Sequence, residues 1–201
     1  MQTHRRSHAE RNAATRAALL TAARELFGTR GFAAVGTEEI VRAAGVTRGA
    51  LYHQFDDKTE LFAAVFEALE AELAACIAEQ LVAAAVSDPV DALVTGAGAW
   101  LDVCAQPAVQ RIVLLDAPSV LGHERFREIA MRYGLGLVVA TLQAGIDQGR
   151  LTPRPVMPLA HVLIGALDEA ALYIARSDDP SVARAEIEPT LGALIDGLVA
   201  S

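Results

Sequence analysis

Side chains able to recognise the edges of nucleotide bases gather in the first third of the chain. Arg48 can bind guanine through two hydrogen bonds, and Thr47 can hydrogen-bond a base or touch a thymine methyl group. Gly49 lacks a side chain, which lets the backbone approach closely, and Tyr52 and His53 offer flat rings with polar tips. This combination favours contact with the major groove of double-stranded DNA.

Residues with the chemistry to bind phosphate flank this group. Thr37 stands at a helix start, where backbone N–H groups attract phosphate, and Arg42 and Lys58 can reach phosphates from neighbouring helices. A cation near a helix start is mildly unfavourable, so the position of Lys58 favours a phosphate role. A flexible basic arm, residues 1–10, together with Arg11 could enter a minor groove.

Two short helices joined by a tight turn would hold these side chains together. The first is predicted to start with Thr37 as its N-cap and to stop at Gly45. Thr47 is predicted to cap the second, which runs to about Phe55. In a helix-turn-helix, the second helix lies in the major groove with its first residues against the base edges. The residues placed to pack the two helices together are Ile40, Ala44, Val46 and Leu51.

The stretch from about residue 16 to residue 66 resembles the DNA-binding domain of the TetR (tetracycline-repressor) family of bacterial regulators. Gly36 departs from the pattern, because the family often has Ser or Thr there, and this puts one backbone contact in doubt. The matching residues, in register over roughly fifty positions, are Ala23, Leu26, Phe27, Arg30, Gly31, Phe32, Thr37, Ile40, Ala44, Gly45, Val46, Thr47, Gly49, Leu51, Tyr52, Phe55, Lys58 and Leu61.

The resemblance implies an all-α homodimer in which three N-terminal helices bind DNA. It also implies a larger C-terminal helical domain that holds a ligand pocket and the dimer surface. Carried over residue by residue, it makes Tyr52 and Lys58 phosphate contacts and turns Thr47, Arg48 and His53 toward the groove. The rest of the chain matches the family only by length and helix pattern.

Composition independently favours an all-α fold. Alanine, the best helix former and a poor strand former, occurs 40 times, and aromatic residues make up only 5% of the chain. Helix start and stop signals predict about nine helices. A long helix over about residues 57–85 would join a helix-turn-helix domain, residues 1–56, to a ligand-binding and dimerisation domain, residues 57–201.

Charge is divided unevenly between these two domains. The chain has a net charge of −8, yet residues 1–50 carry eight Arg and four acids. Residues 59–201 carry eight Arg and nineteen acids. This asymmetry suggests that the basic end meets phosphate while the acidic body repels it.

The remaining helices are predicted only from residues that typically begin or end a helix. Pro107 and Pro118 bracket a short helix, a long helix covers about residues 123–149, and residues 150–158, with three prolines, form a loop. Polar and aromatic candidates for a ligand site are scattered over these elements. They are Trp100, Cys104, Phe126, Tyr133, His161 and Asp168.

Each of these candidates also has an ordinary structural explanation. Trp100 is the only tryptophan and could simply lie in the core, and a lone His such as His161 is often a satisfied core residue. His161 and Asp168 are seven residues apart and share a helix face, where they could anchor a polar group of a ligand. The alanine-rich helices favour a fairly apolar small-molecule effector.

Two final helices are predicted over residues 159–177 and 181–199. Two such helices from each subunit could form a four-helix homodimer interface across a two-fold axis. Alternatively, their apolar stripes complete a monomeric core; the resemblance favours the homodimer. The stripes consist of Leu163, Ala166, Leu167, Ala170, Ile174, Leu191, Leu194, Ile195 and Leu198.

Several classes of protein are disfavoured. Cys76 and Cys104 form no disulfide framework, and no cluster has metal-ligand spacing, so neither a metal nor a cofactor is expected. The start of the chain lacks an apolar signal segment, and the longest uncharged run, residues 133–146, is too short for a bilayer. These features favour a cytoplasmic protein without a membrane partner.

We therefore predict a sequence-specific transcriptional regulator, a repressor released from a palindromic operator by a small molecule. One alternative is a helical architectural protein that binds DNA without a ligand. The other is an all-α enzyme, which the lack of paired carboxylates, a nucleophile elbow and a phosphate loop disfavours.

Overall fold

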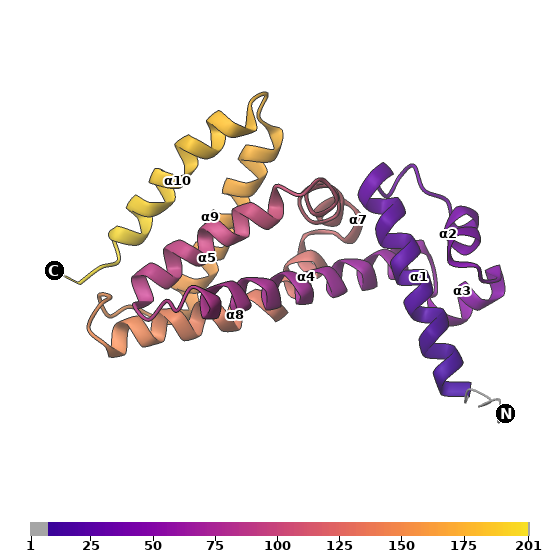
Figure 1. The fold of residues 1–201 in the computed structure, drawn as a ribbon, viewed down its shortest axis with the longest axis horizontal. Helices are drawn as coiled ribbons and strands as arrows, with labels where there is room; N and C mark the ends of the chain where they lie inside the picture. The colour runs from indigo at the N-terminus through magenta and orange to yellow at the C-terminus, as the bar shows by residue number, and fades with distance from the viewer. Residues whose placement is uncertain (1–7, 201) are drawn as a thin grey trace.

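Helices make up most of the computed structural model, which describes residues 8–200 (Figure 1). In chain order they are α1 (His8–Arg30), α2 (Thr37–Ala44), α3 (Arg48–Gln54), α4 (Lys58–Ala83), α5 (Pro89–Cys104), α6 (Pro107–Val109), the π-helical segment η1 (Gln110–Asp116), α7 (Ala117–Leu121), α8 (His123–Asp147), α9 (Val156–Arg176) and α10 (Pro180–Asp196). Because α6, η1 and α7 follow one another directly, the described residues hold nine helical stretches. Their only β-pairing is a single antiparallel bridge between Leu151 and Val199. The all-α fold is confirmed.

Short-range signals place most helix starts correctly. The Thr47 hydroxyl accepts a hydrogen bond from the Ala50 N–H at 3.2 Å, and Asp57 accepts one from the Glu60 N–H at 2.9 Å. Asp88 caps α5 in the same way. These contacts satisfy backbone donors that the first turn of a helix leaves free.

The predicted start of α2 is wrong by one residue. Gly36 is the N-cap, and Thr37 is the first residue of the helix. The Gly36 N–H donates to the Glu39 carboxylate at 3.2 Å, so Glu39 supplies the side-chain contact at this helix start. Gly45 ends α2 with φ of 66°, a left-handed conformation that favours glycine, as predicted.

Two proline-based predictions in the C-terminal part are also wrong. Pro118 does not end the short helix, because it lies in the first turn of α7, which continues directly from η1. Helix α9 begins at Val156 and takes Pro158 into its first turn. A proline is tolerated there because the first N–H groups of a helix have no partner in the helix.

The N-terminal end of the molecule is a compact unit of α1, α2 and α3. Helix α4 leads from this unit into the helical body formed by the later helices (Figure 1). Its core contains Ile40 and Leu51, which are fully buried between α2 and α3, as predicted from their spacing. The rings of Phe27, Phe32 and Phe62 meet in edge-on and tilted contacts that join α1 to α4. The first turns of α4 therefore belong to the same core.

Close contacts connect this end to the helical body. The Phe32 N–H donates to the Asp116 carboxylate at 2.7 Å, just beyond α1 and at the end of η1. A side chain at Gly28 would place its Cβ 2.8 Å from that of Ala108, so α1 and α6 pack with no room for a methyl group. These contacts fix the orientation of α1 on the body.

Helices α8 and α9 are long and apolar enough to cross a membrane by length and composition alone. The two helices instead pack on each other and on α5, α8 also packs on α4, and both contribute side chains to one cavity.

Candidate nucleic-acid interface and internal cavity

The first turns of α3 present the predicted base-contacting residues to solvent. Thr47, Arg48, Gly49, Tyr52 and His53 are all exposed. The Tyr52 ring is 43% exposed, so it is not buried against α1. The capping contact of Thr47 fixes where the helix starts, and this places the five residues at one accessible helix end.

Arg48 is held by two neighbours in the free protein. Its Nη1 lies 2.8 Å from Oε1 of Glu38 on α2, and its guanidinium carbon is 5.5 Å from the centre of the Tyr52 ring. Both members of the ion pair are mostly exposed, and such pairs exchange readily for other partners in water. Arg48 is therefore oriented at the helix start and remains available to a base.

Lys58, by contrast, is engaged by the fold. Its Nζ donates to the carbonyl oxygens of Phe32 and Val35 at 2.9 and 3.0 Å, and it lies 3.9 Å from the centre of the Phe32 ring. It is also the only lysine among the 17 basic Lys and Arg residues of the chain. The sequence did not predict that Lys58 closes the segment between α1 and α2, because the two carbonyls that it binds lie more than twenty residues earlier in the chain. Its phosphate contact stays a prediction.

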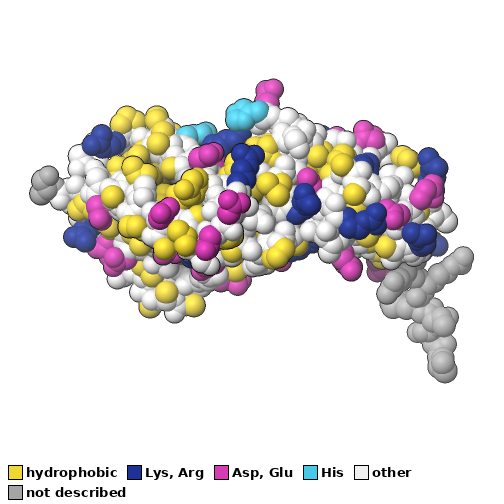
Figure 2. Space-filling view, turned by 90° about the horizontal axis from the view of Figure 1, so that it is seen from above, with side chains coloured by type: hydrophobic (Ala, Val, Ile, Leu, Met, Phe, Trp, Pro, Cys, Tyr) yellow, Lys and Arg dark blue, Asp and Glu magenta, His cyan; other side chains and the backbone are white. Residues whose placement is uncertain are grey.

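Other basic residues surround α3. Arg42 is exposed on α2, while Thr37 is half-buried at the helix start. Arg11 and Arg16 are exposed on α1, and the Arg16 guanidinium lies 4.6 Å above the Phe55 ring. The arm of residues 1–10 lies mostly outside the described residues. In Figure 2, Lys and Arg side chains gather at the N-terminal end together with some acids, whereas apolar side chains gather over the opposite end.

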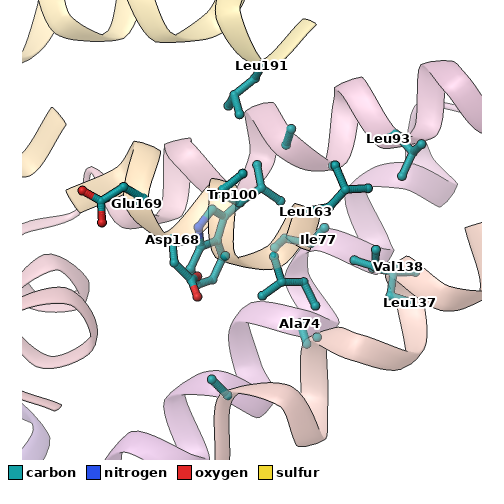
Figure 3. A pocket seen from close by; sticks show the side chains of 18 of the residues that line it. Ala74, Ile77, Leu93, Trp100, Leu137, Val138, Leu163, Asp168, Glu169 and Leu191 are labelled. Carbon is teal, nitrogen blue, oxygen red and sulfur yellow. The ribbon is translucent and has the colours of Figure 1, made fainter. Parts of the chain in front are cut away.

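A cavity of about 610 Å³ lies in the helical body, within the usual range for pockets that take small molecules. Most of its wall is aliphatic or aromatic, and its side chains come from α4, α5, η1, α7, α8, α9 and α10. The wall includes Glu70, Ile77, Leu93, Trp100, Val113, Leu114, Phe126, Arg127, Leu163, Asp168, Glu169 and Leu191. Figure 3 shows Trp100 and Asp168 among apolar side chains, while the Glu169 carboxylate lies apart from them.

Three of the six predicted ligand residues line the cavity, and three lie outside its wall. Trp100, Phe126 and Asp168 line the cavity. Cys104 is 3% exposed in the packed core, where burial raises the pKa of its thiol. The Tyr133 hydroxyl donates to the Glu67 carboxylate of α4 at 3.0 Å. His161 is exposed near the start of α9 and does not line the cavity, whereas Asp168 does.

Two cavity residues escaped the sequence prediction. Arg127 of α8 pairs with Asp168 at 2.8 Å, and Glu70 of α4 is 6% exposed with its Oε1 unpartnered among the described residues. Burial, followed by the nearby Asp168, raises the pKa of Glu70 to about 8. A signal for Glu70 was present, because it lies at helical spacing between the apolar residues Phe66 and Leu73.

Two parts of the chain match the descriptions of the two domains of one family. Residues 19–65 match "Bacterial regulatory proteins, tetR family", and residues 90–198 match "Tetracyclin repressor-like, C-terminal domain". The chain belongs to the TetR family of transcriptional regulators. Its helix-turn-helix is therefore that of a DNA-binding regulator, and the resemblance seen in the sequence is confirmed.

Individual TetR-family proteins are similar over most of the chain. The uncharacterized HTH-type transcriptional regulator YfiR of Bacillus subtilis is 30% identical over 152 residues, covering 73% of this chain and 71% of that protein. The transposon Tn10 TetC protein of Escherichia coli is 27% identical over 178 residues and 84% of each chain. A TetR-family regulator from Pectobacterium atrosepticum has a similar crystal structure, with a TM-score of 0.84 and 33% identity over 98% of this chain and 99% of that one.

Proposed function

We propose that this TetR-family regulator is a cytoplasmic repressor that binds a palindromic operator as a homodimer and leaves it when a small molecule enters the cavity. The observation that carries the proposal is that one chain holds both an exposed recognition helix and an apolar cavity. An architectural DNA-binding protein has no need of such a cavity. In this proposal residues 1–56 bind DNA, and residues 57–201 bind the effector and the second subunit.

The proposed DNA contacts divide into two kinds. Thr47, Arg48 and His53 face the major groove, Gly49 allows close approach, and Tyr52 contacts phosphate. The remaining proposed phosphate contacts are Thr37, Arg42 and Lys58. Their positions at or near one end of the molecule support this division.

Exposed apolar side chains on α9 and α10 support the proposed homodimer. Val162 and Tyr173 are 68% and 51% exposed and, eleven residues apart, lie three turns along one face of α9. Val182 of α10 is similarly exposed. In contrast, many members of the predicted stripes, including Leu163 and Leu191, line the cavity, so they belong to the monomer. The proposed dimer surface is the outer face of the two helices.

The contacts of η1 provide a route from the cavity to DNA. Val113 and Leu114 of η1 line the cavity, and Asp116 at its end accepts the Phe32 N–H next to the DNA-binding helices. An effector that binds more tightly when η1 is shifted would change the orientation of α1. This would change the separation of the two recognition helices of the dimer. The dimer then leaves the operator, because the effector binds more tightly to the state in which the two recognition helices are wrongly spaced.

Selection of binding sites from a random duplex library tests the proposal. The full chain should enrich a palindrome whose half-sites are about 34–36 Å, or a multiple, apart. The Arg48→Ala variant serves as a control and should enrich a less defined sequence. Salt-sensitive binding without any enriched sequence would instead establish the architectural alternative, and a monomer at micromolar concentration would refute the homodimer.

A further inference from the structure

One carboxyl oxygen in the cavity has no hydrogen-bond partner in the part of the chain that the structure describes. Glu70 is 6% exposed, and its Oε1 makes no hydrogen bond within the described residues. The Trp100 indole Nε1 of the same cavity is likewise buried without a partner. Buried polar groups are rarely left unsatisfied, because they lose their bonds to water without replacement. The Glu70 carboxyl, which can accept hydrogen bonds, therefore favours an occupant that supplies a donor.

The charges around Glu70 select the sign of this occupant. Asp168 has its counter-charge, because Arg127 binds it at 2.8 Å. Of Glu70, Asp168 and Arg127, an ionised Glu70 is thus the one whose charge is not compensated. One positive charge on the occupant would make these charges sum to zero. An anionic occupant would have to compete with Asp168 for Arg127 while lying near Glu70.

We infer that the effector is a mostly apolar amine with one positively charged nitrogen, which the Glu70 carboxylate binds while the Trp100 ring and neighbouring aliphatic side chains pack around the body. The aromatic face of Trp100 attracts cations as well as apolar groups. Aliphatic residues such as Ile77, Leu93 and Leu163 offer no hydrogen bonds to the remainder of the molecule. The inference rests on the proposed effector role of the cavity.

Proton release accompanies this binding. With a pKa of about 8, Glu70 holds its proton at neutral pH in the empty cavity, and an ammonium ion favours the ionised form. The affinity for an amine should therefore rise with pH toward 8, by at most about tenfold per unit. Asp168, with a pKa raised by burial to about 6, is already mostly ionised above pH 7. The other titratable or charged side chains that line the cavity are His123, Arg127 and Glu169, and Cys104 lies near enough to feel the charge of Glu70.

Trp100 provides the assay, because it is the only tryptophan in the chain and lines the cavity. Its fluorescence is titrated at pH 7.5 with 4-phenylbutylamine, 4-phenylbutan-1-ol and 4-phenylbutanoate, which share a body and differ in charge. The amine should bind at least about tenfold more tightly than the alcohol or the acid. Glu70→Gln should abolish this preference and the pH dependence, while changing the affinity for the alcohol less than about twofold.

Glu169→Gln is the matched control, since Glu169 lines the same cavity but is exposed, and it should retain the preference. Thermal melting of each variant verifies its fold. Equal affinity for amine and alcohol, tighter binding of the acid, survival of the preference in Glu70→Gln, or binding of no probe would each overturn the inference. Operator binding by the same preparation is measured separately. If DNA is bound and an uncharged or acidic molecule causes release, the proposed repressor function stands while the amine inference fails.

Discussion

Replacing Lys58 with Met should destabilise the N-terminal end of the molecule. Methionine retains an unbranched apolar side chain but removes the charge and all three N–H donors. The change eliminates two hydrogen bonds, from Nζ to the carbonyls of Phe32 and Val35, and a cation–π contact of 3.9 Å with the Phe32 ring. No other lysine in the chain can substitute.

The expected magnitude follows from these three contacts. Each hydrogen bond is part-buried, so water can reach the freed carbonyl, and the loss is about 1 kcal/mol per bond. The cation–π contact adds about 0.5–1 kcal/mol. The free energy of unfolding should thus fall by about 2–3 kcal/mol, which lowers Tm by about 4–12 °C for a chain of this size.

Circular dichroism melting of the wild type, Lys58→Met and Lys58→Arg measures this effect. Lys58→Arg keeps the charge, but a planar guanidinium is larger than an ammonium group and cannot reach the Phe32 and Val35 carbonyls and the Phe32 ring in the same way. It should therefore restore less than half of the lost free energy of unfolding. A Lys58→Met variant that melts within about 1 °C of the wild type would refute the structural role. At a temperature where all variants are folded, the salt dependence of DNA binding tests the phosphate contact separately. Loss of that contact reduces the slope by about 0.9, whereas a purely structural lysine leaves the slope unchanged.

Three further predictions concern other parts of the molecule. Arg48→Ala should reduce discrimination between the operator and single-base variants by about tenfold at one position, as measured by competition binding; undiminished discrimination would remove Arg48 from base contact. Gly28→Ala should destabilise the protein by about 1–3 kcal/mol through the clash with Ala108, and adding Ala108→Gly should restore Tm; failure of this rescue would refute the packing argument. The raised pKa of Glu70 implies that folded protein retains a proton that unfolded chain loses between pH 4.5 and about 8. This contribution to stability is complete below pH 4.5 and is lost as the pH rises to about 8, by at most about 1.4 kcal/mol per pH unit. The difference in free energy of unfolding between the wild type and Glu70→Gln, measured by chemical denaturation, should therefore change with pH. A difference that stays constant with pH would contradict the prediction.

The DNA-binding helices could be predicted because local signals determine them. The capping side chain of Thr47, the glycine at position 45 and the spacing of Ile40 and Leu51 act within a few residues, and each has the role that the sequence predicts. Even the error at Thr37 is a shift of one residue, since Glu39 rather than the N-cap side chain satisfies the helix start. Local chemistry thus determines α2, α3 and the residues that they expose.

The cavity could not be predicted to the same extent, because its wall depends on how distant helices pack. Trp100 and Asp168 were found by residue type, yet the same criterion also selected Cys104 and His161, which point to the core and to solvent. Periodicity identifies the buried face of a helix but does not distinguish a filled core from a hollow one. Glu70 illustrates this limit: its place on an apolar face was visible, whereas its role depends on helices far along the chain.

These two kinds of determinant also explain how DNA binding and effector binding can be coupled without sharing residues. The recognition helix owes its shape to neighbours in sequence, so a change in the cavity leaves α3 itself intact. What such a change can alter is the orientation of the whole N-terminal unit, which rests on few polar contacts with the body. Asp116 receives the Phe32 N–H, and on the α4 side Arg125 of α8 binds both carboxylate oxygens of Glu60 at 2.6 and 2.8 Å. In the proposed mechanism, an occupant that shifts η1 or α8 would move the unit as a rigid body and so change the spacing that a palindromic operator requires.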